Sequence, residues 1–228
     1  MSDENPYAPP QTTVTPLSGD DETVEELNPW TAIWLRPKAT IRFILATDPG
    51  RAVLALAAIS GVAQTLDRAV MKSLGDQLEM PIIFAIAFFV GPLSGIFGLY
   101  ISGAFLRWTG SMLKGTAESQ DVRAAIAWSS VPVVWFLPMW IPQLLLFGKE
   151  LFTTETPRMD SDPMLFSALI GIGTVETVIG VWSFVVLLHT LGQAHGFSAW
   201  KALGSILIAI LIIAVPLTLL VIGLAAAV

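Results

Sequence analysis

The chain has 228 residues, of which 54% are hydrophobic and only 13% charged. A soluble domain of this size cannot bury so large an apolar share, so the composition argues against a soluble protein and favours an integral membrane protein. The lack of cysteine excludes disulfides and thiolate metal sites. The net charge of −6 belongs to the N-terminus: residues 1–27 carry seven acidic and no basic residues, whereas the remaining eleven acidic and twelve basic residues nearly cancel.

Residues 1–27 combine acidic residues, threonines and prolines. Such a segment cannot bury enough apolar area to offset the entropy of ordering it, so we expect a disordered acidic tail. It lacks the basic and apolar regions of a cleavable signal peptide, so none is expected. A solubilising role is favoured over a partner-binding one.

Residues 28–47 have the composition of a segment that lies in a membrane interface. Apolar side chains three, four or seven positions apart can share one helical face: Trp30, Ile33, Trp34, Ile41, Ile44 and Leu45. Cations lie off that face, and tryptophans beside cations suit the headgroup layer. We therefore expect an interfacial amphipathic helix, interrupted at Pro37, with the membrane-interface residues Trp30, Trp34, Arg36, Lys38 and Arg42. The alternative is that the apolar face packs against the end of the helix bundle.

Five apolar segments follow, over about residues 49–74, 80–105, 122–147, 163–191 and 199–227. Asp48-Pro49 and Asp162-Pro163 each combine a helix N-cap with a proline suited to the first turn. The first segment is the weakest, because its uncharged part, residues 52–66, has only 15 residues and a span needs about 20. The predicted fold is all-α: a polytopic membrane domain over residues 28–228 with five transmembrane helices.

The basic residues predict an orientation for these five spans. One side would hold eight Lys and Arg residues and the other four, namely Arg68, Lys72, Lys149 and Arg158. Loops rich in Lys and Arg face the cytoplasm. We therefore expect a cytoplasmic N-terminus and, with five spans, a C-terminus on the far side.

Glu176 is the sharpest anomaly, because it lies near the middle of the fourth span. A carboxylate at this depth faces the bundle or a cavity and has either a functional or a structural role. The functional reading is a proton or cation site, and the structural reading is a protonated acid bonded to a neighbouring helix. Asp67 and Arg68 either form a pair at the interface, which is favoured, or reach into the bundle to meet Glu176.

In the second span Gly91 and Gly95 form a GxxxG step, and Ser94, Gly98 and Ser102 form a second row of small residues. Small residues let helix backbones approach closely, so these three glycines are predicted to serve in helix packing. The third span carries Pro132, Pro138 and Pro142, which predict a kinked helix.

The sequence gives no support for an enzyme, because it lacks the common catalytic motifs. The sequence has no HExxH, Walker A or GxSxG motif, and the two histidines are six positions apart, which does not suit a metal pair on one helix. We expect no catalytic, cofactor-binding or metal-ligating residues.

The segment Asn28-Pro-Trp-x-x-Ile-Trp-x-Arg-Pro-Lys-x-Thr-Ile-Arg-x-Ile-Leu45 resembles the opening signature of the Yip domain family, named for Ypt- and Rab-interacting membrane proteins. Further motifs occur in the order typical of bacterial-type members: Leu66-Asp-Arg-Ala69, Gly91-Pro-Leu-Ser-Gly95, Arg107-Trp-Thr-Gly110, the segment 122–132 and His195-Gly-Phe-Ser198. The resemblance implies a five-helix membrane domain with a cytoplasmic N-terminal region. It brings no catalytic or ligand-binding residues.

The predicted function is an interaction, scaffold or membrane-organising role in a bacterial inner membrane. Its expected partners are membrane lipids and other membrane proteins or a second copy, and not nucleic acid. The alternative is a small permease or ion-coupled transporter that uses Glu176.

Overall fold

The computed structural model describes residues 27–226, so residues 1–26 of the predicted acidic tail lie outside the described part. The described residues form helices and contain no strand. Five segments are long and apolar enough to cross a membrane, which confirms the predicted all-α fold with five spans. These segments are Val53–Met71, Met80–Met112, Ser119–Phe152, Pro163–His195 and Ala199–Leu219.

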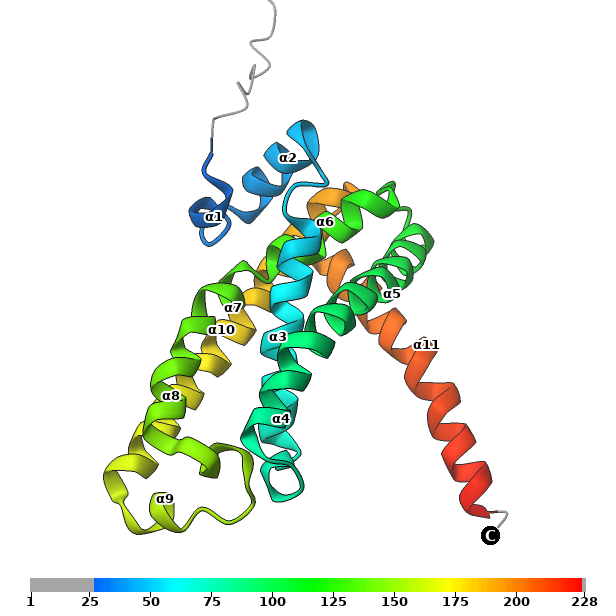
Figure 1. Ribbon diagram of the computed structural model, residues 1–228. Helices are drawn as coiled ribbons and strands as arrows, with labels where there is room; N and C mark the ends of the chain where they lie inside the picture. Colours follow the sequence, from blue (N-terminus) through cyan, green and yellow to red (C-terminus); the bar gives the residue numbers. More distant parts are fainter. Residues whose placement is uncertain (1–26, 227–228) are drawn as a thin grey trace, which may run out of the picture.

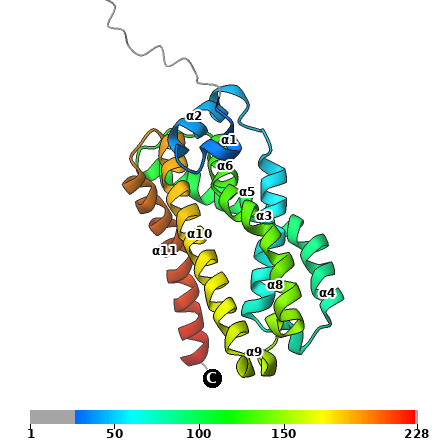
Figure 2. The ribbon, with the colours of Figure 1, turned by 90° about the vertical axis from the view of Figure 1, so that its left-hand side faces the viewer.

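The bundle has two distinct ends (Figures 1 and 2). One end, called the collar end, carries the short helices α1 (Pro29–Ala32) and α2 (Pro37–Thr47). The opposite end, called the loop end, carries the turns η1 (Leu74–Asp76) and η4 (Gly148–Phe152) and the short helix α9 (Pro157–Ser161). The C-terminal helix also ends on the loop-end side (Figure 1), as an odd number of crossings requires.

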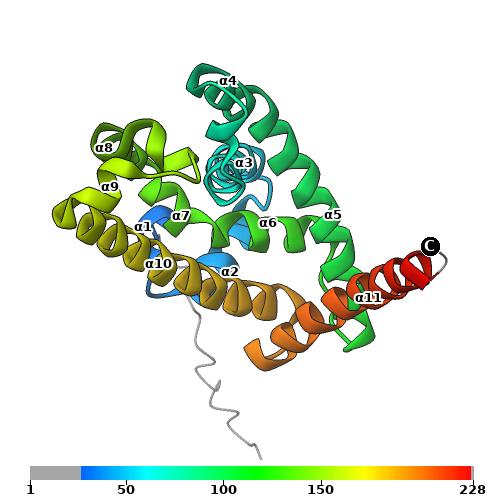
Figure 3. The ribbon, with the colours of Figure 1, turned by 90° about the horizontal axis from the view of Figure 1, so that it is seen from below.

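The first span, α3 (Val53–Met71), lies at the centre of the bundle (Figure 3). It packs most closely against α5 (Gly91–Met112) at a seam of glycines. A Cβ atom on Gly61 would collide with the carbonyl oxygen of Gly91, and one on Gly95 with that of Ala57. Gly91 and Gly95 therefore lie in a contact that has no room for a side chain. Gly98 does not, because a Cβ there would meet no atom within 4 Å.

Prolines interrupt the second and third spans. The second comprises α4 (Met80–Ala85), a π-helical turn η2 (Ile86–Val90) and α5, with Pro92 in the first turn of α5. The third comprises α6 (Ser119–Ser129), α7 (Val131–Phe136), the 3₁₀ turn η3 (Leu137–Met139), α8 (Trp140–Phe147) and η4. Proline lacks the amide hydrogen that continues a helix, and a proline lies beside the breaks at Gly91, Ser130 and Leu137. The breaks at Ile86 and Gly148 have no adjacent proline. As a result of the breaks in the third span, α6 crosses the collar end, and α7 and α8 continue toward the loop end (Figures 1 and 3).

The apolar face of residues 29–47 is directed at the bundle. Ile33, Ile41 and Ile44 are fully buried in a cluster that includes Trp128. Two indole N–H groups tie this region together: Trp182 Nε1 donates to the carbonyl of Trp34 and Trp128 Nε1 to that of Arg51, both at 3.2 Å. The packing alternative for this face is therefore realised by the three isoleucines.

The last two helices differ in how they join the bundle. The fourth span, α10 (Pro163–His195), contacts α2, α6, α7 and α11. The fifth, α11 (Ala199–Ala226), is attached near its collar end, where Ala202 and Ala209 are buried and Ser205 Oγ lies 2.8 Å from Thr109 Oγ1 of α5. Beyond that point α11 diverges from α5 (Figure 1).

Candidate functional site

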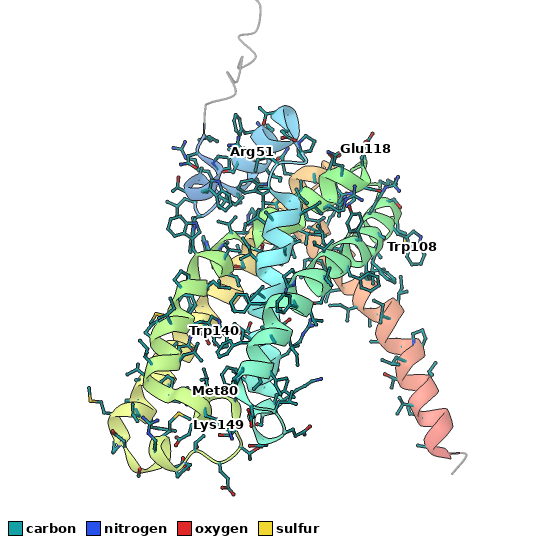
Figure 4. All side chains as sticks on the ribbon, in the orientation of Figure 1. Arg51, Met80, Trp108, Glu118, Trp140 and Lys149 are labelled. Carbon is teal, nitrogen blue, oxygen red and sulfur yellow. The ribbon has the colours of Figure 1, made fainter. Side chains whose placement is uncertain are left out.

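A cavity of about 440 Å³ lies between α3, α7–α8 and α10. Its wall is mostly apolar and includes Trp140 of α8, which lies on the side of α8 that faces α3 (Figure 4). The polar groups that line it are Asp67 of α3, Gln143 of α8, and Glu176 and Thr177 of α10. Apolar hollows with a few convergent polar groups are the usual form of small-ligand sites, so this cavity is the candidate functional site.

Glu176 is held by a neighbouring helix. The buried amide of Gln143 donates from Nε2 to Glu176 Oε1 at 2.7 Å. The hydroxyls of Thr174 and Thr177 instead donate to carbonyls of their own helix, those of Ile170 and Gly173. Glu176 is therefore oriented from α8 and not by the threonines beside it.

Asp67 brings a second carboxylate to the same cavity. Asp67 reaches the cavity from α3, whereas Glu176 reaches it from α10. The two side chains are close enough for their charges to interact. The described residues that line the cavity include no basic side chain. Two ionised carboxylates in one membrane cavity repel each other and are poorly solvated, so a shared proton or a small cation would stabilise the pair.

Asp67 and Arg68 do not act as a pair at this cavity. Successive residues of a helix point about 100° apart, and Arg68 lines a different hollow, between α3, α5 and α6. The structure thus brings Asp67 to Glu176 and separates Arg68 from both.

The predicted membrane-interface residues divide into two kinds. Trp30 and Trp34 are half-buried, with the Trp30 ring 5.2 Å from that of Trp128. Arg36, Lys38 and Arg42 are exposed at the collar end. The tryptophans thus contribute to packing against the bundle, while the cations face outward.

Sequence reasoning did not single out Gln143. The only sequence signal for Gln143 is that it is the one side-chain amide in the apolar run of α8. Its contact with Glu176 joins residues 33 positions apart, so sequence spacing does not reveal it. A single sequence does not show which faces of α8 and α10 meet. Among the described residues, no three His, Asp or Glu side chains cluster as metal ligands do.

Comparison with known proteins gives one positive result. The family model of the Yip1 domain matches residues 31–222. Neither the search of curated proteins nor the search of solved structures returned a match. The match covers most of the chain, including all of α3, α5 and α10 and most of α11. The chain therefore belongs to the Yip1 domain family and is an integral membrane protein of that family.

Proposed function

We propose that this chain is a non-catalytic membrane-organising protein that presents a fixed basic collar to an anionic lipid surface. The observation that carries the proposal is the way the collar is built. Buried isoleucines fix α1 and α2 to the bundle, while Arg36, Lys38 and Arg42 remain exposed. A cation on a fixed element gains about 1 kcal/mol near an anionic membrane surface, so several together orient the bundle.

We further propose that the chain resides in a bacterial inner membrane, as a bacterial-type member of its family, with the collar end in the cytoplasm. Eight of the twelve Lys and Arg residues belong to segments at the collar end: Arg36, Lys38, Arg42, Arg51, Arg107, Lys114, Arg123 and Lys201. The positive-inside rule supports this orientation. Other membrane proteins or a second copy would contact the lipid-facing helices.

The orientation can be tested with single cysteines, because the natural chain has none. Thr31→Cys reports on the collar end and Glu155→Cys on the loop end, and both positions are exposed. A membrane-impermeant maleimide applied to intact spheroplasts should label position 155 and reach position 31 only after permeabilisation. The reverse pattern would refute the orientation.

The organising role can be tested in nanodiscs of anionic or zwitterionic lipid. A fluorophore on Ala39→Cys, which is exposed on α2, reports contact with quencher-labelled headgroups. Replacing Arg36, Lys38 and Arg42 with Gln should lower quenching in anionic discs only. The matched control replaces Lys72, Lys149 and Arg158 at the loop end and should leave quenching unchanged. Equal quenching for the collar variant and the natural chain would contradict the proposal.

A second candidate function is a small permease or ion-coupled transporter, and the cavity with Asp67, Gln143 and Glu176 favours it. Two carboxylates that face one membrane cavity are typical of proton and cation pathways. In proteoliposomes with a pH or cation gradient, transport through this site should be lost in Glu176→Gln and retained in Glu155→Gln. Folded Glu176→Gln protein with unchanged flux would remove the support for this candidate.

A further inference from the structure

A second hollow of about 270 Å³ lies between α3, α5 and α6, on a different face of α3 from the carboxylate cavity. On α3 it extends from Ala57 to Arg68, which at 1.5 Å per residue is roughly 16 Å. It is open beside Gly98, where a Cβ would meet no atom within 4 Å. This hollow is called the Arg68 groove.

The inner part of the Arg68 groove offers no free hydroxyl donor. Its four serines all donate within the protein: Ser60 to Ser130 Oγ, Ser130 to the carbonyl of Ala127, Ser94 to that of Gly91 and Ser102 to that of Gly98. Leu99 and Ile126 supply apolar surface beside them. Serines whose protons are engaged tolerate an apolar neighbour, so this part of the groove suits a hydrocarbon chain.

The mouth of the groove is different in character. Gln64 and Arg68 lie one helical turn apart on α3 and both line it. In the part of the chain that the structure describes, neither side chain has a hydrogen bond or ion pair. Arg68 is in the last turn of α3, beside the loop end, so its guanidinium lies near the headgroup level of that leaflet. A guanidinium at this level favours a phosphate, which it can bind through two parallel N–H groups.

We propose that the Arg68 groove binds one anionic phospholipid from the leaflet at the loop end. The phosphate pairs with Arg68 and accepts from the amide of Gln64, and one acyl chain extends along α3 past Gly98. The chemical order of the groove, with free donors at the mouth and satisfied groups within, matches the order of a phospholipid. This inference is independent of the basic collar, which lies at the other end of the bundle.

The test uses the full chain in detergent, titrated with phosphatidylglycerol or with phosphatidylcholine of the same acyl chains. Native mass spectrometry measures the apparent affinity of the first bound lipid, and thermal unfolding confirms that each variant is folded. The natural chain should bind one phosphatidylglycerol more tightly than phosphatidylcholine. Arg68→Gln should lower the apparent affinity for phosphatidylglycerol by about fivefold or more, which is the effect of losing one cation near the surface. Lys72→Gln, the matched control, removes a neighbouring cation that does not line the groove and should change affinity less than about twofold.

A second pair of variants tests the hollow itself. Gly98→Leu places its Cβ where no atom lies within 4 Å and extends a side chain into the groove, so it should weaken the binding of both lipids while thermal unfolding shows that the protein stays folded. Gly171→Leu, which adds the same side chain on another open helix face, should leave binding unchanged.

Three results would overturn the proposal. Equal losses in Arg68→Gln and Lys72→Gln would show diffuse charge attraction. Unchanged binding in Gly98→Leu would show that no chain enters the groove. A lipid-free dimer abolished by Gly98→Leu would assign the groove to a second copy.

Discussion

The short helices α1 and α2 at the collar end and the turns at the loop end are held by different interactions. At the collar end, α1 and α2 are fixed by buried isoleucines, and indole N–H groups donate to main-chain carbonyls. At the loop end, carboxylates accept from main-chain N–H groups. Asp76 Oδ1 accepts from the amide of Thr154 at 3.1 Å, and Glu150 accepts from the amides of Arg158 and Met159, both at 3.1 Å. Figure 4 shows the two ends, with Arg51 and Glu118 at the collar end and Lys149 at the loop end.

This difference has a consequence for how each end responds to its surroundings. Apolar burial and neutral indole donors do not depend on pH, whereas a carboxylate cap requires the ionised acid. The packing of α1 and α2 at the collar end should therefore stay fixed over a wide pH range, and the Asp76 connection at the loop end should loosen on acidification. Three substitutions, taken from the largest expected effect to the smallest, test this contrast.

Trp128→Ala should have the largest effect, because Trp128 is fully buried, contacts Trp30 and donates to the carbonyl of Arg51. Removing a buried indole costs about 3–5 kcal/mol of unfolding free energy. Circular dichroism during thermal unfolding in detergent should show a clearly lower Tm, with the same loss at pH 5 and pH 8. A loss that depended on pH would contradict the contrast between the two ends.

Glu150→Ala should have a smaller and local effect. The substitution leaves the first amides of α9 without their acceptor, comparable to the loss of a helix cap at about 1–2 kcal/mol. Trypsin should cleave after Arg158 faster in the variant. Glu155→Ala is the control, because that side chain is exposed and makes no hydrogen bond among the described residues. Equal cleavage rates for the two variants would show that Glu150 does not hold the loop.

Asp76→Asn should have the smallest effect, and its signature is in the pH dependence. Hydrogen bonds from the hydroxyl and then the amide of Thr154, with Lys149 nearby, lower the pKa of Asp76 below its ordinary value of 3.8. A lowered pKa means that the stabilising contribution is present above about pH 4 and is lost as the pH falls through the lowered value.

Hydrogen exchange at the Thr154 amide measures this contribution. Its protection factor in the natural chain should fall on acidification below about pH 4, whereas in Asp76→Asn it should be lower at neutral pH and change little. An unchanged pH profile in the variant would place the acid sensitivity elsewhere.

Much of the architecture was predictable because lipid imposes simple rules on sequence. Each span must be apolar over its length, so five apolar runs sufficed to predict five spanning helices. Even the short first segment forms a spanning helix, α3, with Arg68 in its last turn. The prolines of the third span marked its interruptions, because the missing amide hydrogen acts locally.

The sites were less predictable, because they depend on which helix faces meet. Glu176 was recognisable alone, but its partners Gln143 and Asp67 are brought to it by two other helices. Gly98 was predicted to serve in helix packing like Gly91 and Gly95, yet of the three only Gly91 and Gly95 lie in the seam with α3. Spacings of three and four residues both keep a glycine on the same helix face, so the sequence does not show where the two helices separate. The apolar face of residues 29–47 was equally hard to assign, because the same sequence pattern suits a helix that packs on lipid and one that packs on protein.

The attachment of α11 has a consequence for the order in which the chain assembles. Among the described residues, the two hydrophobic clusters around Trp128 and around Phe152 contain no residue of α11, which contributes only to the third cluster through Ala202 and Ala209. During synthesis α11 leaves the ribosome after the four spans that precede it. The first four spans can therefore complete most of their tertiary packing in the membrane before it arrives, and α11 joins a bundle that is already formed.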